Sequence, residues 1–112
     1  MTTGSPVSGP RARAARVPLL ESREGLSPAQ QEAWDAIAES RGRVVGPFAV
    51  LLHSPEVARR VAALGHLLRF EGRLSAVERE LAILAVARAL DCQFEWAAHA
   101  PLARRAGVRE DA

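Results

Sequence analysis

The sequence predicts an all-α protein, and three observations carry that prediction. Apolar residues recur at intervals of three and four along most of the chain after residue 26. Capping motifs led by serine, together with glycines, divide that part into segments of helical length. No segment alternates apolar and polar residues as a strand does, and no hairpin turn is evident. We therefore expect a bundle of four to five helices.

The composition is that of a globular domain. With 112 residues, 48% hydrophobic and 25% charged, the chain is long enough for one domain with a modest core. We expect a disordered basic tail over residues 1–16, rich in Gly, Pro, Ser and Arg, and one helical domain over residues 17–112. The absence of Lys, Asn and Tyr indicates a GC-rich and hence bacterial genome.

The charge and cysteine content exclude several classes of function. The net charge is only +2, and acidic and basic residues are mixed along the helical part, so nucleic acid is not an expected partner. No apolar run approaches the length of about 18 residues that a membrane span needs, and no secretory signal is evident. The single cysteine, Cys92, rules out an internal disulfide and fits a cytoplasmic location.

The first predicted helix lies in the segment LSPAQQEAWDAIAES. Ser27 is its expected N-cap, Pro28 its first residue, and Gln30 completes a capping box. Its apolar stripe consists of four residues, Ala33, Trp34, Ile37 and Ala38. The pattern predicts an amphipathic helix that packs on one side.

The next helical segment follows two glycine breaks and the short apolar run FAVLL. It opens with Ser54-Pro55-Glu56, a cap, a proline and a first-turn acid, and it ends at Gly72. Its expected buried face consists of Val57, Val61, Leu64, Leu67 and Leu68.

The helix predicted from Ser75 to Leu90 begins with a capping box formed by Ser75 and Glu78. From residue 81 to residue 87 it is apolar all round, so we expect it to be central in the bundle. Glu80 lies one turn before Leu84, on the same side of this helix. The pattern predicts a partly buried carboxylate, which needs a hydrogen bond or a positive partner.

The last predicted helix contains CQFEWAAHAPLARRA and stops at Gly107. Helical spacing places Cys92, Glu95 and His99 on its inward stripe. Pro101 removes one helical hydrogen bond and disfavours helical geometry at the preceding residue, so a kink or break is expected just after His99.

Taken alone, this stripe has a structural interpretation beside a chemical one, since buried Cys and inward His commonly serve packing. A metal site is disfavoured, because Cys92 and His99 lie two turns apart, about 10 Å along a helix. No phosphate-loop or dinucleotide motif is present, so no cofactor is predicted. The remaining histidines, His53 and His66, are interpreted as structural.

The second half of the chain resembles the carboxymuconolactone decarboxylase family, which includes the alkylhydroperoxidase D-like proteins. The motifs that carry the resemblance are the Glu of REL, the apolar LAILAVAR helix, EWxxH and the closing AGV, within residues 47–109. The resemblance implies an alkylhydroperoxidase D-like helical bundle that assembles as a homo-oligomer. Family members commonly continue with further helices after AGV, so this bundle is expected to lack those C-terminal helices.

The peroxidase branch of the family has a glutamate, a CxxC motif twelve residues later, and a histidine four residues after the second cysteine. Glu80, Cys92 and His99 match three of these four positions, and Glu95 stands at the fourth. The resemblance implies peroxiredoxin-like, antioxidant chemistry in which Cys92 attacks a peroxide, served by Glu80 and His99. Because the resolving cysteine is missing, turnover requires an external thiol reductant.

Two further interpretations stay open. Decarboxylase members use neither a metal nor an organic cofactor, and Glu80, Glu95 and His99 are then acid and base groups acting on a small carboxylated lactone or enolisable acid. In either enzyme Phe94 and Trp96, which flank Glu95, are the expected pocket residues. The last interpretation is an inactive or truncated helical assembly module, in which uncovered apolar faces bind other copies.

Overall fold

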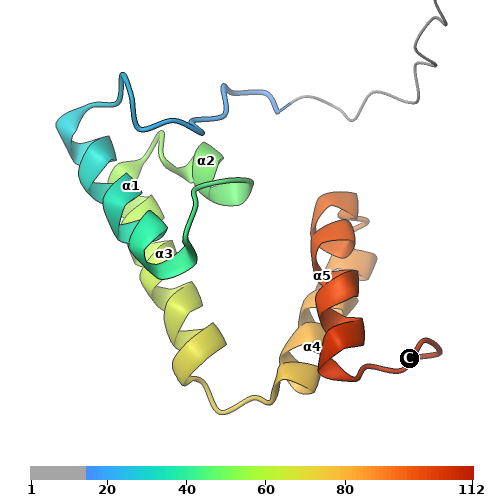
Figure 1. Cartoon of the computed structure of the whole chain (residues 1–112). Coiled ribbons are helices and arrows are strands. Elements are labelled where there is room, and N and C mark those ends of the chain that lie inside the picture. The colour runs from blue at the N-terminus through green and yellow to red at the C-terminus, as the bar shows by residue number, and fades with distance from the viewer. Residues whose placement is uncertain (1–14) are drawn as a thin grey trace, which may run out of the picture. The chain divides into compact units, whose positions relative to one another are not determined.

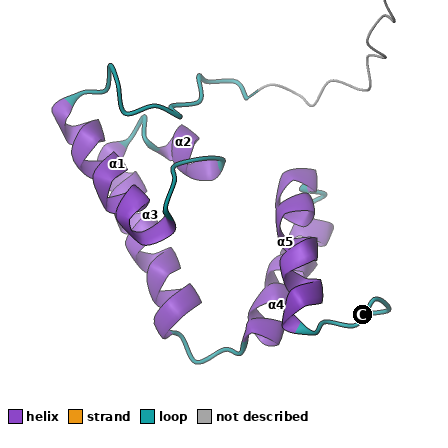
Figure 2. Cartoon of the chain, viewed as in Figure 1, coloured by secondary structure: helices purple, strands orange, loops and turns teal. Residues whose placement is uncertain are grey.

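The computed structural model describes residues 15–112, and the regular structure in this range is entirely helical (Figure 2). The helices are α1 (Pro28–Arg41), α2 (Pro47–Leu51), α3 (Pro55–His66), α4 (Ala76–Ala89) and α5 (Gln93–Ala106), with a π-helical turn, η1 (Leu67–Glu71), directly after α3. Figure 1 colours these helices in chain order, from blue near the N-terminus to red at the C-terminus. The prediction of an all-α chain with four to five helices is confirmed for this range.

The chain divides into two compact units, Met1–Ala62 and Ala63–Ala112, and each is described by itself. Most of the predicted disordered tail, residues 1–14, lies outside the described residues. Among residues 15–112, no helix combines the length and the apolarity needed to cross a bilayer.

The first unit is built around a core of apolar side chains from α1, α2 and α3. Ser27 begins α1 with the predicted capping box, in which its hydroxyl accepts from the Gln30 amide at 3.2 Å. Ile37 and Leu52 are fully buried, and burying a side chain of this size contributes about 1.5–3 kcal/mol. The buried core consists of Ala33, Ile37, Val44, Leu52, Ala58 and Ala62, with Leu20, Trp34, Ala38, Phe48 and Leu51 packed against it.

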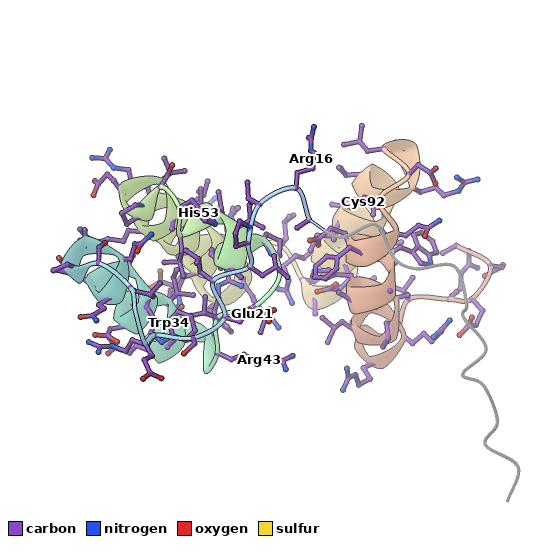
Figure 3. The ribbon with its side chains drawn as sticks, turned by 90° about the horizontal axis from the view of Figure 1, so that it is seen from above. Arg16, Glu21, Trp34, Arg43, His53 and Cys92 are labelled. Atoms are coloured by element: carbon purple, nitrogen blue, oxygen red, sulfur yellow. The ribbon has the colours of Figure 1, made fainter. Side chains whose placement is uncertain are left out.

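The segment before α1 is tied to the same unit by two hydrogen bonds. The amide of Leu20 donates to the carbonyl of Ala49 at 3.0 Å, and the ring Nε2 of His53 donates to the carbonyl of Pro18 at 2.7 Å. Figure 3 labels His53 on this unit. Because its ring holds a backbone segment in place, His53 has a structural role.

The second unit consists mainly of η1, α4 and α5, and α4 packs along α5 (Figure 1). The predicted capping box begins α4: the Ser75 hydroxyl accepts from the Glu78 amide at 3.2 Å, and Glu78 Oε2 accepts from the Ser75 amide at 2.9 Å. A short turn joins the two helices through Asp91, whose φ of 51° is left-handed, a conformation that Asp tolerates better than most residues.

The π-helical turn η1 continues α3 without a break and ends at Gly72, as predicted. Gly72 is not left-handed, but a Cβ there would lie 2.7 Å from the Leu68 carbonyl oxygen. Any other residue at position 72 would therefore push this turn apart.

The prediction of a buried face on the helix that ends at Gly72 is wrong, both for its residues in the first unit and for those in the second. The buried residues of α3 are the alanines Ala58 and Ala62. The five larger side chains assigned to that face, Val57, Val61, Leu64, Leu67 and Leu68, are 41–56% exposed. The periodicity correctly marks an apolar stripe, but nothing within either unit covers it.

Two expectations for the second unit also need correction. Within the second unit, helix α4 is not central: its buried residues are Glu80 and Ala87, while Leu81 and Val86 are exposed, because α5 covers only one of its sides. We expected a kink or a break just after His99, and the break is ruled out, because helix α5 runs through Pro101 from Gln93 to Ala106. Pro101 is exposed and costs the helix only a single hydrogen bond, to the Ala97 carbonyl.

Candidate functional site

Glu80 is the buried polar side chain around which the candidate site is built. It lies in the second turn of α4, on the side that packs against α5, and the residue is 4% exposed. This confirms the expected burial, and burial is more complete than the sequence indicated. A buried carboxylate is costly unless polar partners replace the water it has lost.

Two side chains supply those partners. Nδ1 of His99, on α5, lies 2.8 Å from Oε2 of Glu80, a full hydrogen bond. Nε of Arg79, next to Glu80 on α4, lies 3.6 Å from Oε1, which makes an ion pair. Each oxygen of the buried carboxylate therefore faces one nitrogen. An ionised carboxylate only accepts, so His99 carries its proton on Nδ1 when Glu80 is ionised.

Glu95 extends this arrangement on the other side of the imidazole. It precedes His99 by one helical turn on α5, and its Oε2 lies 3.4 Å from Nε2 of His99. Exposure rises along the three side chains, from 5% for Glu80 to 20% for His99 and 33% for Glu95. We call these three residues the carboxylate–imidazole chain, because they connect a buried carboxylate to the surface through one imidazole.

Cys92 lies apart from this chain. It is the N-cap of α5, and its backbone is extended, with φ −90° and ψ 91°. Cys92 is therefore not a helical residue, and helical spacing does not place it on one stripe with Glu95 and His99. Its amide donates to the Ala87 carbonyl at 2.7 Å, and its partly buried thiol makes no hydrogen bond within residues 15–112.

Cys92 instead lines an open cavity of about 450 Å³, large enough for a small molecule. Figure 3 labels Cys92 on the second unit. Arg88 and Trp96 are the cationic and aromatic residues that line this cavity, the other lining residues being Ala87, Asp91, Gln93 and Ala97.

A second cavity lies along α4, α5 and the residues that follow them, and it shares Arg88 and Trp96 with the first. Its volume is about 260 Å³, and its floor is mainly apolar, with Leu81, Leu84, Ala100 and Ala103 among the lining residues. Trp96 thus lines both cavities, but Glu95, the residue beside which it was expected to form a pocket, lines neither. Phe94 lines neither cavity and is 58% exposed.

The four predicted site residues therefore form two groups: three residues that contact one another, and Cys92 by itself. Glu80, Glu95 and His99 are joined by contacts, and none of them lines either of these two cavities. Cys92 lines one cavity and contacts none of the three. Within residues 15–112, no group of three or more His, Cys, Asp or Glu side chains is arranged to hold a metal ion.

Sequence reasoning missed Arg79. It is not among the predicted site residues, yet only 23% of its side chain is exposed and it contacts Glu80. The available signal was its position next to a carboxylate predicted to be buried, since such a carboxylate needs a positive partner.

Within residues 15–112 the regular structure is helical, and it holds an imidazole between two glutamates, one of them buried. The chain is a member of the carboxymuconolactone decarboxylase family: the family's sequence model matches residues 55–112, just over half of the chain. The match contains η1, α4, α5 and all four predicted site residues. Neither the curated proteins nor the solved structures gave a significant match.

Proposed function

We propose that this protein is a carboxymuconolactone decarboxylase-family enzyme that transfers protons to and from a small carboxylated lactone or enolisable acid, without a cofactor. The observation that carries the proposal is the position of His99, with Glu80 at 2.8 Å from Nδ1 and Glu95 at 3.4 Å from Nε2. Both ring nitrogens face carboxylates, which leaves neither of them for the thiol of Cys92. This favours the acid–base interpretation over the thiol interpretation.

Each member of the carboxylate–imidazole chain has a distinct task in this mechanism. Glu95 is the most exposed and meets the substrate. For a decarboxylation, the electrons of the breaking C–C bond move into the conjugated carbonyl as CO₂ leaves, and protonated Glu95 then gives its proton to the resulting carbanion. Solvent restores the spent proton: Nε2 of His99 takes a proton from water and passes it to the Glu95 carboxylate, and Glu80 stabilises the intervening imidazolium by accepting from Nδ1–H.

The test is turnover of a panel of small carboxylated lactones and 3-oxo acids, followed by CO₂ release and by deuterium uptake at the substrate carbon. Glu80→Gln, Glu95→Gln and His99→Gln should each lower kcat/KM about 100-fold or more, the usual contribution of a general acid or base. Cys92→Ser should leave the rate within about twofold of wild type. Glu71→Gln is the matched control, because Glu71 is an exposed glutamate of the same unit. Full activity of His99→Gln contradicts the proposal.

A second candidate function is thiol chemistry, supported by the cavity that Cys92 shares with Arg88. The thiolate attacks a peroxide oxygen, the O–O bond breaks, and the alkoxide takes a proton to leave as an alcohol or water. The resulting sulfenic acid is reduced by two equivalents of an external thiol, which release water and become a disulfide. Cys92→Ser abolishes peroxide consumption in this case, and His99→Gln does not, because His99 makes no contact with the thiol.

Exposed apolar side chains of the second unit support a further proposal, that the protein assembles into a homo-oligomer. In the second unit the exposed large apolar residues are Leu64, Leu67, Leu68, Phe70, Leu74, Leu81, Val86, Leu90, Phe94 and Trp96. So many exposed apolar side chains in 50 residues are typical of a surface that another chain covers. A protein that assembles but turns over neither substrate class would be the assembly module instead.

A further inference from the structure

The side chain of Arg79 is held at two points within the second unit. Its Nη1 donates to the carbonyl of Arg69 at 3.2 Å, and its Nε faces Oε1 of Glu80 at 3.6 Å. Nε is buried and makes no hydrogen bond within residues 15–112, so the carboxylate is the negative charge that it faces. Only 23% of this side chain is exposed, which is low for an arginine.

The first contact anchors the guanidinium. The Arg69 carbonyl belongs to η1, which ends two residues later, so it has no acceptor role within that turn. Arg79 satisfies this carbonyl and is thereby fixed relative to η1. Since the guanidinium is planar and rigid, fixing one of its nitrogens restricts where the others lie.

The second contact bears on the orientation of Glu80. The terminal torsion of a glutamate is broad, so burial alone does not determine the plane in which its two equivalent oxygens lie. Arg79 lies by Oε1, and this leaves Oε2 for Nδ1 of His99. A carboxylate held in this way keeps the imidazole in one tautomer and one orientation.

We propose that Arg79 is the positioning residue of the carboxylate–imidazole chain. Its guanidinium, anchored on the Arg69 carbonyl, orients Glu80 so that His99 donates through Nδ1 and presents Nε2 to Glu95. This inference rests on the proposed acid–base function, because the same side chains carry that function. It adds a residue that touches neither His99 nor Glu95, and it links the π-helical turn to the chemistry.

The experiment reads the imidazole directly and needs no substrate. The full chain is labelled with ¹⁵N-histidine, which gives ring signals from only three residues, His53, His66 and His99. Arg79→Gln should move the ring ¹⁵N and ¹H signals of His99 toward those of the urea-unfolded chain, because the carboxylate is no longer oriented. The signals of His53 should stay in place, since this residue is bonded to Pro18 in the other unit.

Arg88→Gln is the matched control, because Arg88 lies on the same helix, is exposed and makes no contact with the carboxylate–imidazole chain. It should leave the His99 signals unchanged. Wild-type His99 signals in folded Arg79→Gln overturn the inference. Should Arg79→Gln fail to fold, Arg79→Lys decides: an ammonium on a flexible stem lacks the rigid planar fork that fixes two nitrogens at once, so the His99 signals should move in the same direction but less. Unchanged signals in Arg79→Lys would then overturn the inference.

Turnover separates this inference from the proposed function. Arg79→Gln should lower kcat about tenfold and leave KM within about twofold, because Arg79 does not touch the substrate. If no substrate is turned over while the His99 signals move, the proposed function fails and the positioning role stands. If turnover requires Glu80 and His99 while Arg79→Gln changes neither kcat nor the His99 signals, the positioning role alone fails.

Discussion

The two units of this chain bury very different material. The first buries Ile37, Leu52 and Val44 within a cluster of apolar residues. The buried residues of the second are two alanines, Ala87 and Ala103, and the carboxylate of Glu80. The first unit therefore has a core of its own, whereas the second organises its interior around an ionisable group and leaves its large apolar side chains exposed. The apolar core thus lies in the first unit, and the proposed acid–base chemistry lies in the second.

The largest expected effect on stability tests the core of the first unit. Ile37→Ala removes a fully buried side chain and should lower the free energy of unfolding by about 2–5 kcal/mol, because it loses apolar burial and leaves a cavity. The two tryptophans allow each unit to be followed separately: Trp34 lies in the first unit and Trp96 in the second. Urea unfolding of Ile37→Ala with Trp96→Phe, read by Trp34 fluorescence, measures the effect.

The counterpart in the second unit is Leu74→Ala in a Trp34→Phe background. Leu74 is 54% exposed, and truncation of such a residue should change the free energy of unfolding by about 0.5 kcal/mol or less in dilute protein. Equal losses for Ile37→Ala and Leu74→Ala would contradict the difference between the two units.

The next test concerns assembly. It examines whether other copies of the chain cover the exposed apolar side chains of the second unit. Leu68→Asp places a charge within its exposed apolar surface and should shift the mass measured by light scattering from an oligomer to a monomer. Val45→Asp is the control, since Val45 is 40% exposed in the first unit. A wild-type chain that is monomeric at high concentration would rule out the homo-oligomer. If Val45→Asp disrupts assembly and Leu68→Asp does not, the interface lies on the first unit instead.

The features predicted most reliably from the sequence are those that depend on a few neighbouring residues. Both capping boxes, Ser27 with Gln30 and Ser75 with Glu78, form as expected, because a cap depends on only four consecutive residues. The burial of Glu80 was also predictable, since it shares a helix side with residues that face a neighbour. The buried face from Val57 to Leu68 was wrong, because periodicity shows which side is apolar but not whether anything packs on it.

The candidate site was predictable to the extent that its residues follow helical spacing. Glu95 and His99 are one turn apart on α5 and do lie together. Cys92 does not join them, because the left-handed Asp91 makes Cys92 the N-cap rather than a helical residue. Arg79 could have been found from its position beside the buried carboxylate, but its anchor could not, because that anchor is a carbonyl of the π-helical turn, for which the sequence carries no known signal.

Smaller effects distinguish the helix starts of the two units. Ser27→Ala and Ser75→Ala each remove the hydroxyl that accepts an amide hydrogen bond, and each should cost about 1 kcal/mol. The loss from Ser27→Ala should appear in Trp34 fluorescence, and that from Ser75→Ala in Trp96 fluorescence. Should either loss appear in both probes, the two units unfold together, and the contrast between them holds only for the folded state.

The smallest expected effect is a pH dependence, which should differ between the two capping boxes because only one of them contains a charged group. In α1 the reciprocal acceptor is the neutral amide of Gln30, at 3.0 Å from the Ser27 amide, whereas in α4 it is the carboxylate of Glu78. The hydrogen bonds from the amide and then the hydroxyl of Ser75 hold the pKa of Glu78 below its usual value of 4.5. A lowered folded-state pKa contributes stability above about pH 4.5 that is lost as the pH falls through the folded value.

The start of α4 should therefore loosen on acidification in a way that the start of α1 does not. The amide ¹H and ¹⁵N shifts of Ser75, followed by NMR from pH 6 downward, should titrate with a midpoint below 4.5, while the amide of Ser27 should show no comparable step. Glu78→Gln converts the charged box into the neutral kind and should abolish the step at Ser75 while keeping the helix start. If the step at Ser75 persists in Glu78→Gln, it arises from another carboxyl group, and the two helix starts differ for a reason other than the charge of their caps.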